Sequence, residues 1–320
     1  MDKLPSQTTD ALSKTLRENL RRRRPWYLGR VFWFVVPLTL LGGFILWWNL
    51  PTGQPPRLLV VALDQLSADG KPLTLRGRIE PWPKDAQAVA LGGVNVFFVI
   101  DRKAQPATSD PFGDLVATAS VLPEGGGFTV RHVGTRERPG SEDSARVFAW
   151  PADSKLLVVD VEETLAAIAA DAWPRENPLD IAPRPDAAAA LREAEANGYH
   201  IVYFALSGDS ALAYRKVRGW MYQRIARKDG FPAGPVLGRL SYHDQTEPRA
   251  AAMQYLLKTF HAAPISLCAL VGTKAAARSA AATGARTILV ADQDDRPQGD
   301  GAEIMYAKTW LEVMTMLSKP

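Results

Sequence analysis

The chain has 320 residues, a hydrophobic content of 47% and a formal net charge of only +4. This length leaves room for two domains with appendages, and the composition is that of a globular protein, which excludes a disordered or low-complexity chain. The near-neutral charge argues against nucleic acid as a partner. A single cysteine, Cys268, excludes a disulfide within the chain.

The first feature along the chain is an apolar run from Val31 to Trp48, in which Thr39 is the only polar residue. The run is long enough to cross a hydrocarbon core of about 30 Å. Four arginines, Arg21–Arg24, precede it, and no charged residue follows it until Arg57. By the positive-inside rule this asymmetry predicts that the N-terminus is cytoplasmic.

We therefore expect residues 1–30 to form a basic cytoplasmic segment and residues 31–50 to form a single transmembrane anchor. The remainder of the chain is expected on the outer side of the membrane, periplasmic or exoplasmic. A cleaved signal peptide is the main alternative, but no small-x-small cleavage site follows Trp48.

Residues 57–152 contain short segments of alternating apolar and polar residues, separated by clusters of Gly, Pro and Asp. Regular short strands with turn signals predict a β-sandwich domain. We interpret it as a spacer or recognition domain, and a purely structural β-domain is the alternative. The predicted strands are 57–63, 72–79, 94–100, 115–122, 127–133 and 145–150.

Residues 153–320 alternate predicted strands with predicted helices, which indicates an α/β domain with a doubly wound parallel sheet. The amphipathic pattern of residues 302–317 predicts one further, C-terminal helix. The other predicted elements are strands near 155–160, 199–206, 265–271 and 287–291, and helices near 185–197, 210–227 and 247–261.

The strand at 155–160 ends in Asp160, and Glu162 and Thr164 follow it. Ligands of open α/β sheets bind at the carboxyl edge of the strands. A carboxylate at that edge can attack phosphorus, and a second acid close by can protonate the leaving group and then activate water. Magnesium, which prefers hard oxygen ligands, can neutralise the charge. The alternative is an ordinary strand-end acid in a Rossmann-like domain.

The order of motifs resembles that of one family. Asp160-x-Glu162-x-Thr164 is followed by a strand ending in Ser207-Gly208, by Gly230-Phe-Pro-x-Gly-Pro235, by a lysine on a helix and by Gly272-Thr-Lys274. This order resembles the haloacid-dehalogenase-like (HAD) domain of the lipin/Ned/Smp (LNS) type. The nearest version is the C-terminal domain of the membrane-associated phosphatidylinositol-transfer (retinal-degeneration-B-like) proteins.

The resemblance covers about residues 153–291 and implies a HAD-like fold that binds phosphatidic acid or, as in lipins, dephosphorylates it. It assigns Asp160 to the nucleophile of the active members. Glu162 stands where the family has its acid/base Asp and is longer by one methylene. Thr164 and Ser207 match the hydroxyl groups of the first and second motifs.

The resemblance also assigns basic residues. Lys258 matches the residue that neutralises the transferring phosphoryl group, with Lys216 as the alternative. Active members place carboxylates after the third strand to hold magnesium, whereas Gly272-Thr-Lys274 places a lysine there. Since a cation repels magnesium, we predict a degenerate, non-catalytic domain without metal or other cofactor.

In this interpretation Thr164, Ser207, Lys258 and Lys274 bind an anionic group, either phosphate or a phospholipid head group. Two alternatives remain open. One is a weak or altered phosphatase that uses Asp160, Glu162 and magnesium. The other is a membrane-anchored scaffold that binds a protein partner.

Overall fold

The computed structural model describes residues 57–69, 73–82, 91–135, 139–205, 210–228, 230–242, 246–260, 268–272, 283–290 and 304–317. They belong to one compact unit, Pro55–Pro320. The predicted cytoplasmic segment and the predicted anchor, residues 1–30 and 31–50, lie outside the described residues. Among the helices that are described, none is long and apolar enough to cross a membrane.

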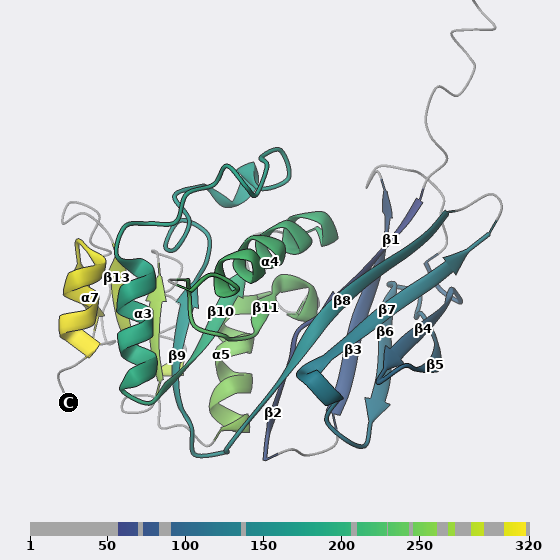
Figure 1. Ribbon diagram of the computed structural model, residues 1–320, viewed down its shortest axis with the longest axis horizontal. Coiled ribbons are helices and arrows are strands. Elements are labelled where there is room, and N and C mark those ends of the chain that lie inside the picture. Colours follow the sequence, from purple (N-terminus) through teal and green to yellow (C-terminus); the bar gives the residue numbers. More distant parts are fainter. Residues whose placement is uncertain are drawn as a thin grey trace, which may run out of the picture. The chain divides into compact units, whose positions relative to one another are not determined.

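The first part of this unit consists of two β-sheets (Figure 1). The three-stranded sheet is antiparallel. In the five-stranded sheet the first pair is parallel and the others are antiparallel. In spatial order the strands of the first sheet are β1 (Arg57–Leu63), β3 (Leu73–Trp82) and β6 (Asp114–Ala119), and those of the second are β2 (Gln65–Ala68), β8 (Pro139–Trp150), β7 (Gly127–Gly134), β4 (Asn95–Ile100) and β5 (Lys103–Thr108).

The two sheets contribute to one hydrophobic core, in which Leu75 of β3, Phe98 of β4 and Val130 of β7 are fully buried. Two sheets packed face to face around one core is the arrangement that a β-sandwich requires. The parallel pairing of β2 with β8 departs from the antiparallel sheets expected for that fold. The β-sandwich therefore stays a prediction.

The second part is a six-stranded parallel sheet with helices, so the chain is a mixed α/β protein, as predicted. The spatial order of its strands is β11 (Val236–Gly238), β10 (Tyr199–Ala205), β9 (Lys155–Asp160), β12 (Cys268–Gly272), β13 (Arg286–Val290) and β14 (Ile304–Ala307). The helices are α3 (Ala187–Ala196), α4 (Ala211–Ile225), α5 (Pro248–Thr259) and α7 (Trp310–Leu317), and short 3₁₀ helices span Glu124–Gly126, Ala170–Ala172 and Arg239–Tyr242.

Strand β9 shows why this sheet is covered on both faces. Its side chains alternate between the two faces of the sheet, as the period of a strand dictates. Leu157 and Val159 belong to a core that also includes α3, α4 and α7, whereas Leu156 and Val158 belong to a core that includes α5. All four residues are fully buried, which is the pattern of a central parallel strand.

The predicted C-terminal helix over 302–317 is wrong in its first part. Ile304–Ala307 forms strand β14, which pairs in parallel with β13, and the helix begins only at Trp310. Pairing with β14 satisfies the backbone N–H and C=O groups along the edge of β13, which would otherwise lack partners. This gain in hydrogen bonding outweighs the preference of the sequence pattern for a helix. The short strands β2, β5 and β11 were also absent from the sequence-based prediction.

Strand β1 is shared by both parts of the unit. Val60 and Ala62 face the core of the two β-sheets, whereas Val61 and Leu63 face the core of the α/β part. Helix α4 contacts both β1 and β10. Residues 57–152 and 153–320 therefore share buried surface on either side of the predicted domain boundary, and their division into two domains stays a prediction.

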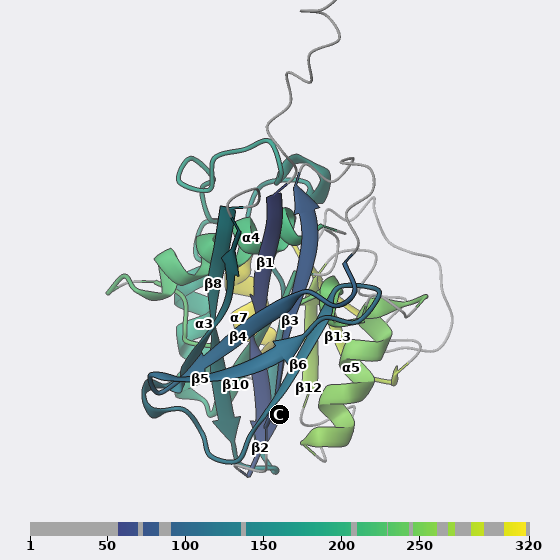
Figure 2. The ribbon, with the colours of Figure 1, turned by 90° about the vertical axis from the view of Figure 1, so that its right-hand side faces the viewer.

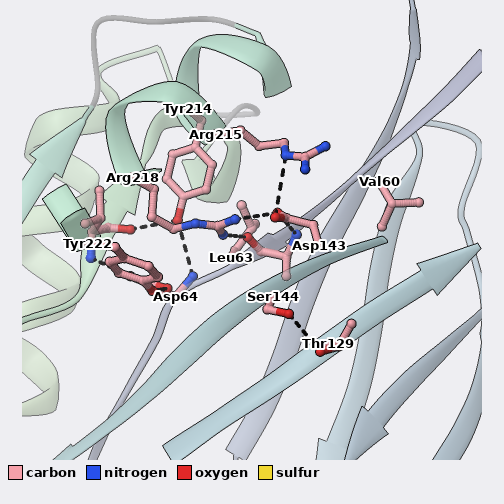
Figure 3. Close-up of polar contacts among 12 residues, drawn as sticks. Val60, Leu63, Asp64, Thr129, Asp143, Ser144, Tyr214, Arg215, Arg218 and Tyr222 are labelled. Carbon is pink, nitrogen blue, oxygen red and sulfur yellow. Dashed lines mark hydrogen bonds and ion pairs between the residues drawn. The ribbon is translucent and has the colours of Figure 1, made fainter. Parts of the chain in front are cut away.

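A buried polar cluster reinforces this contact (Figure 3). The Asp143 carboxylate of β8 accepts a hydrogen bond from the backbone N–H of Ala62 at 2.9 Å and from the guanidinium of Arg218 on α4. Arg218 also donates to the carbonyl of Ala62. Since β1 and β8 are not neighbours in a sheet, these side chains satisfy backbone groups of β1 that would otherwise be buried without partners.

Asp64, just after β1, is the second centre of this cluster. Its carboxylate accepts hydrogen bonds from the backbone N–H groups of Arg146 at 3.0 Å and Val236 at 2.9 Å, and from the hydroxyl of Tyr222. Burial raises the pKa of Asp64, although the nearby Arg218 and these hydrogen bonds act in the opposite direction. One carboxylate thus connects β8, β11 and α4.

Candidate functional site

Asp160 lies at the carboxyl end of β9, between the ends of β10 and β12. From β9 the chain proceeds through β10 to β11 on one side, and then returns to β12 on the other side. This reversal of strand order is the position at which open α/β sheets bind ligands. The sequence-based prediction that Asp160 ends a buried parallel strand is therefore confirmed.

The Asp160 carboxylate is buried, with 1% of the residue exposed, and it pairs with Arg249 in the first turn of α5. The Arg249 Nε atom donates to Oδ1 at 3.2 Å and Nη2 donates to Oδ2 at 2.9 Å. This two-pronged geometry is the strongest form of an arginine–carboxylate pair. A positive charge therefore stands directly against the residue that the resemblance assigns as the nucleophile.

The backbone after Asp160 forms a compact, hydrogen-bonded loop. The N–H of Val161 donates to the carbonyl of Phe204 on β10, and the N–H groups of Leu165 and Ala166 both donate to the carbonyl of Val161. Glu163 has a positive φ of 63°, which is uncommon for a residue other than glycine. The turn is therefore tight enough to impose an unusual backbone conformation.

Two side chains from elsewhere fix this loop further. Arg184 donates to the carbonyl of Glu163 at 3.1 Å, and the indole N–H of Trp310 donates to the carbonyl of Thr164 at 3.3 Å. Glu162 and Thr164 are 4% and 1% exposed. Within the described part of the chain, the Thr164 hydroxyl has no hydrogen-bond partner. Such a buried hydroxyl costs free energy unless something pairs with it.

The structure places the predicted site residues as follows. Asp160, Glu162 and Thr164 share one buried loop. Lys258 is exposed at the far end of α5, about 13 Å along the helix axis from Arg249 at 1.5 Å per residue. Ser207 and Lys274 lie outside the described residues. No finding tests whether any of them binds a ligand, so those assignments stay predictions.

Lys216, the alternative to Lys258, lies on α4 and donates hydrogen bonds to the carbonyls of Pro174 and Glu176 at 2.6 and 2.9 Å. These contacts hold the connection that follows β9. Arg249 was missed by the sequence analysis. Pro248 marks the first turn of α5 and so places Arg249 there, but no local pattern indicates that its side chain reaches β9.

Magnesium fits poorly beside Asp160. Both carboxylate oxygens face the Arg249 guanidinium, and a fixed cation there opposes the approach of a second one. Among the described residues, no group of three or more His, Cys, Asp or Glu side chains could hold a metal ion. The described residues beside Asp160 therefore do not suit magnesium.

Comparison with known proteins adds little to this geometry. No protein-family model matches the chain, and no curated protein matches it. Among solved structures, the chain is similar to CbbY from Rhodobacter sphaeroides in complex with phosphate, with a TM-score of 0.34 and 13% identity over 50% of this chain and 96% of CbbY.

A second similar structure is that of the titin domains Z1Z2 in complex with telethonin. Its TM-score is 0.22, with 13% identity over 34% of this chain and 58% of the titin chain. Both TM-scores are low, so these similarities carry no argument about the site or its chemistry.

Proposed function

We propose that the α/β part of this protein is a degenerate HAD-like domain that binds a phosphate-bearing anion without catalysing phosphoryl transfer, and that residues 31–50 anchor it in a membrane. The observation that carries the proposal is the pairing of Arg249 with both oxygens of Asp160 at the ligand-binding edge of the sheet.

The topology supports an anion site and argues against a dinucleotide site. Dinucleotide-binding sheets of this strand order have a glycine-rich turn after the first strand, which lets the backbone approach a pyrophosphate. Here β9 is followed by Asp160-Val-Glu162-Glu-Thr164, and the next glycine is Gly198. The acidic turn instead resembles the first HAD motif, with Glu162 in place of its second Asp.

The pairing with Arg249 disfavours nucleophilic attack. A carboxylate nucleophile must present an oxygen to phosphorus, and both oxygens of Asp160 accept hydrogen bonds from Arg249. Releasing one oxygen means breaking part of a buried ion pair, which costs several kcal/mol. That cost adds to the barrier of any step that begins from Asp160.

The same arginine can bind an anion. A guanidinium has five N–H donors in a planar fork, and the pair with Asp160 uses its Nε and Nη2 edge. The edge formed by Nη1 and Nη2 lies outside this pair, and its geometry suits two oxygens of a phosphate. Lys274 and Ser207 remain predicted partners of that anion from the sequence.

Binding of inorganic phosphate to the full-length protein, measured by isothermal titration calorimetry, tests this proposal. Asp160→Asn removes the carboxylate and keeps the arginine, so phosphate binding should persist. Asp160→Asn with Arg249→Gln removes both charges together, and affinity should fall at least about tenfold because charge-assisted hydrogen bonds are worth about 1.5–3 kcal/mol. Lys155→Gln, at the opposite end of β9 from Asp160, is the matched control, and Lys258→Gln tests the basic residue that was predicted from the sequence.

Two outcomes would overturn this reading. Phosphate binding lost in Lys258→Gln and unchanged in the double variant would move the anion to the other end of α5. Magnesium-dependent hydrolysis of phosphatidic acid or a simple phosphate ester, abolished in Asp160→Asn, would establish a phosphatase instead.

The membrane part of the proposal rests on the sequence alone. The apolar run Val31–Trp48, preceded by Arg21–Arg24, favours a single-pass anchor with a cytoplasmic N-terminus. The described part would then lie on the outer side, where a phospholipid head group or free phosphate is the candidate ligand. Co-flotation of the full chain with vesicles tests the anchor separately from phosphate binding.

A further inference from the structure

The described part of the chain begins at Arg57, the first residue of β1, and several strand ends meet there. In the three-stranded sheet Arg57 of β1 pairs with Trp82, the last residue of β3. Strand β6 is antiparallel to β3 and begins at this same end, since its first residue, Asp114, pairs with Arg78. Figure 2 shows the start of β1 and the end of β3 side by side at its upper side.

The β7–β8 hairpin reaches the same end. Strand β8 runs in the same direction as β1, because its successive side chains contact successive residues of β1. Ser141 accepts a hydrogen bond from the N–H of Val60, and Asp143 accepts one from the N–H of Ala62. The first residues of β8, and the last residues of β7 that pair with them, therefore lie near the start of β1.

Large apolar side chains are exposed at this end. Trp82 is 43% exposed, Phe112 just before β6 is 66% exposed, and Val133 near the end of β7 is 66% exposed. Exposed apolar residues scattered singly are normal, and these three share a position at the end of the sheets where β1 begins. We define these three residues as the apolar rim.

Phe112 is held outward by a structured turn. The Asp110 side chain accepts hydrogen bonds from the backbone N–H groups of Phe112 and Asp114, both at 2.8 Å. Gly113 adopts a positive φ of 85°, and its carbonyl accepts a hydrogen bond from the N–H of Ile79. The exposure of this ring is therefore built into the fold.

The position of the rim along the chain points to its partner. The apolar run Val31–Trp48 ends nine residues before Arg57, and an extended chain of that length spans at most about 30 Å. Arg57, at the end of the sheets that carries the rim, thus lies within that distance of the point where the predicted anchor leaves the bilayer. Tryptophan is enriched where protein meets the membrane–water interface, and phenylalanine and aliphatic side chains enter the head-group boundary.

We propose that the apolar rim rests on the lipid surface and orients the described part of the chain on the membrane. This inference rests on the proposed anchor. A bilayer on this rim buries Trp82, Phe112 and Val133, while Arg57, exposed at the start of β1, lies at the level of the head groups. The carboxyl edge of β9 then takes a fixed orientation relative to the membrane.

The test uses the full-length protein in vesicles of phosphatidylcholine and phosphatidylglycerol, in a Cys268→Ser background. A fluorophore is attached at Phe112→Cys and, separately, at Val133→Cys. Val121→Cys is the matched control, because Val121 is 74% exposed beyond the opposite end of β6, and the six residues of that strand separate its two ends by about 17 Å. Lipids that carry brominated acyl chains should quench the label at 112 and 133 and leave the label at 121 unchanged.

The outcomes separate this inference from the anchor. If the protein floats with the vesicles but the labels at 112, 133 and 121 are quenched equally, the anchor is supported and the lipid contact is overturned. A protein partner would then be the candidate for binding the rim. Protein that fails to float would overturn the anchor and, with it, this inference. Phosphate binding by Arg249 is measured independently of both.

Discussion

Arg218 of helix α4 and Asp143 of strand β8 form a buried ion pair between the two parts of the described unit, with side chains that are 4% and 9% exposed (Figure 3). The same carboxylate caps the N–H of Ala62, and the same guanidinium caps its carbonyl. The pair thus satisfies backbone groups on the edge of β1 that pairs with none of the described strands.

The first prediction is that the two arginines that contact Asp143 contribute unequally to the free energy of unfolding. Arg218→Met leaves a buried carboxylate with a weaker partner and should lower the free energy of unfolding by about 3 kcal/mol. Arg215 contacts the other oxygen at 3.5 Å and its side chain is 32% exposed, so Arg215→Met should cost less than about 1 kcal/mol. Urea denaturation of the full chain measures both, and equal losses would contradict this ranking.

The second prediction follows from the raised pKa of Asp64. Between the unfolded pKa of about 3.9 and the higher folded pKa, the folded state holds more protons than the unfolded state, so this group's contribution to stability falls as pH rises. Asp64→Asn removes that dependence. It also replaces the acceptor for the N–H of Val236 with an amide donor, which should cost about 1–3 kcal/mol.

The difference in unfolding free energy between wild type and Asp64→Asn should therefore be largest near pH 4 and shrink toward pH 7. Denaturation of both proteins across this range provides the measurement. A difference that grows with pH would show that Arg218 and the hydrogen bonds, rather than burial, dominate the titration of Asp64.

The third prediction concerns Glu80 of β3, whose carboxylate accepts a hydrogen bond from the N–H of Ala211 at 2.7 Å. Ala211 is the first residue of α4, so Glu80 places a negative charge at the positive end of the helix dipole. Glu80→Gln removes this charge and should lower the melting temperature, at a cost of about 1 kcal/mol.

Glu142→Gln is its control. Glu80 and Glu142 each pair with an arginine, Arg78 and Arg131, but both side chains of the second pair are more than half exposed. An exposed pair of this kind contributes little, so the melting temperature should hardly change. Similar shifts in melting temperature for both variants would show that the contact of Glu80 with α4 stabilises the protein no more than an exposed ion pair does.

The parts of this fold that could be predicted from sequence are those that local pattern determines. The run Lys155–Asp160 has four consecutive apolar residues and a terminal acid, and it is a central parallel strand. The apolar run Leu58–Leu63 predicted strand β1, whose bounds are Arg57–Leu63. By contrast, this run did not reveal that the two faces of β1 serve two different cores, because an apolar run indicates burial and does not identify what each face contacts.

The polar contacts were hidden for the same reason. Arg218 and Arg249 have the sequence context of solvent-exposed helical arginines, and only tertiary packing brings them to Asp143 and Asp160. Asp160 itself could be identified because a strand-end acid carries a local signature. Its partner could not, because Arg249 lies 89 positions away in sequence and no periodicity connects the two.

The last prediction tests the ion pair at the candidate site by a double-mutant cycle. Arg249→Gln leaves the buried carboxylate of Asp160 without its guanidinium and should lower the free energy of unfolding by about 3–5 kcal/mol. Asp160→Asn keeps a side-chain oxygen for one of the two hydrogen bonds and should cost less. In the double variant two neutral amides face each other, so part of the loss in Arg249→Gln should be recovered, with a coupling of about 0.5–3 kcal/mol. Urea denaturation of the four proteins measures this coupling, and additive losses would show that the two side chains do not interact in solution and would remove the argument that Arg249 restrains Asp160.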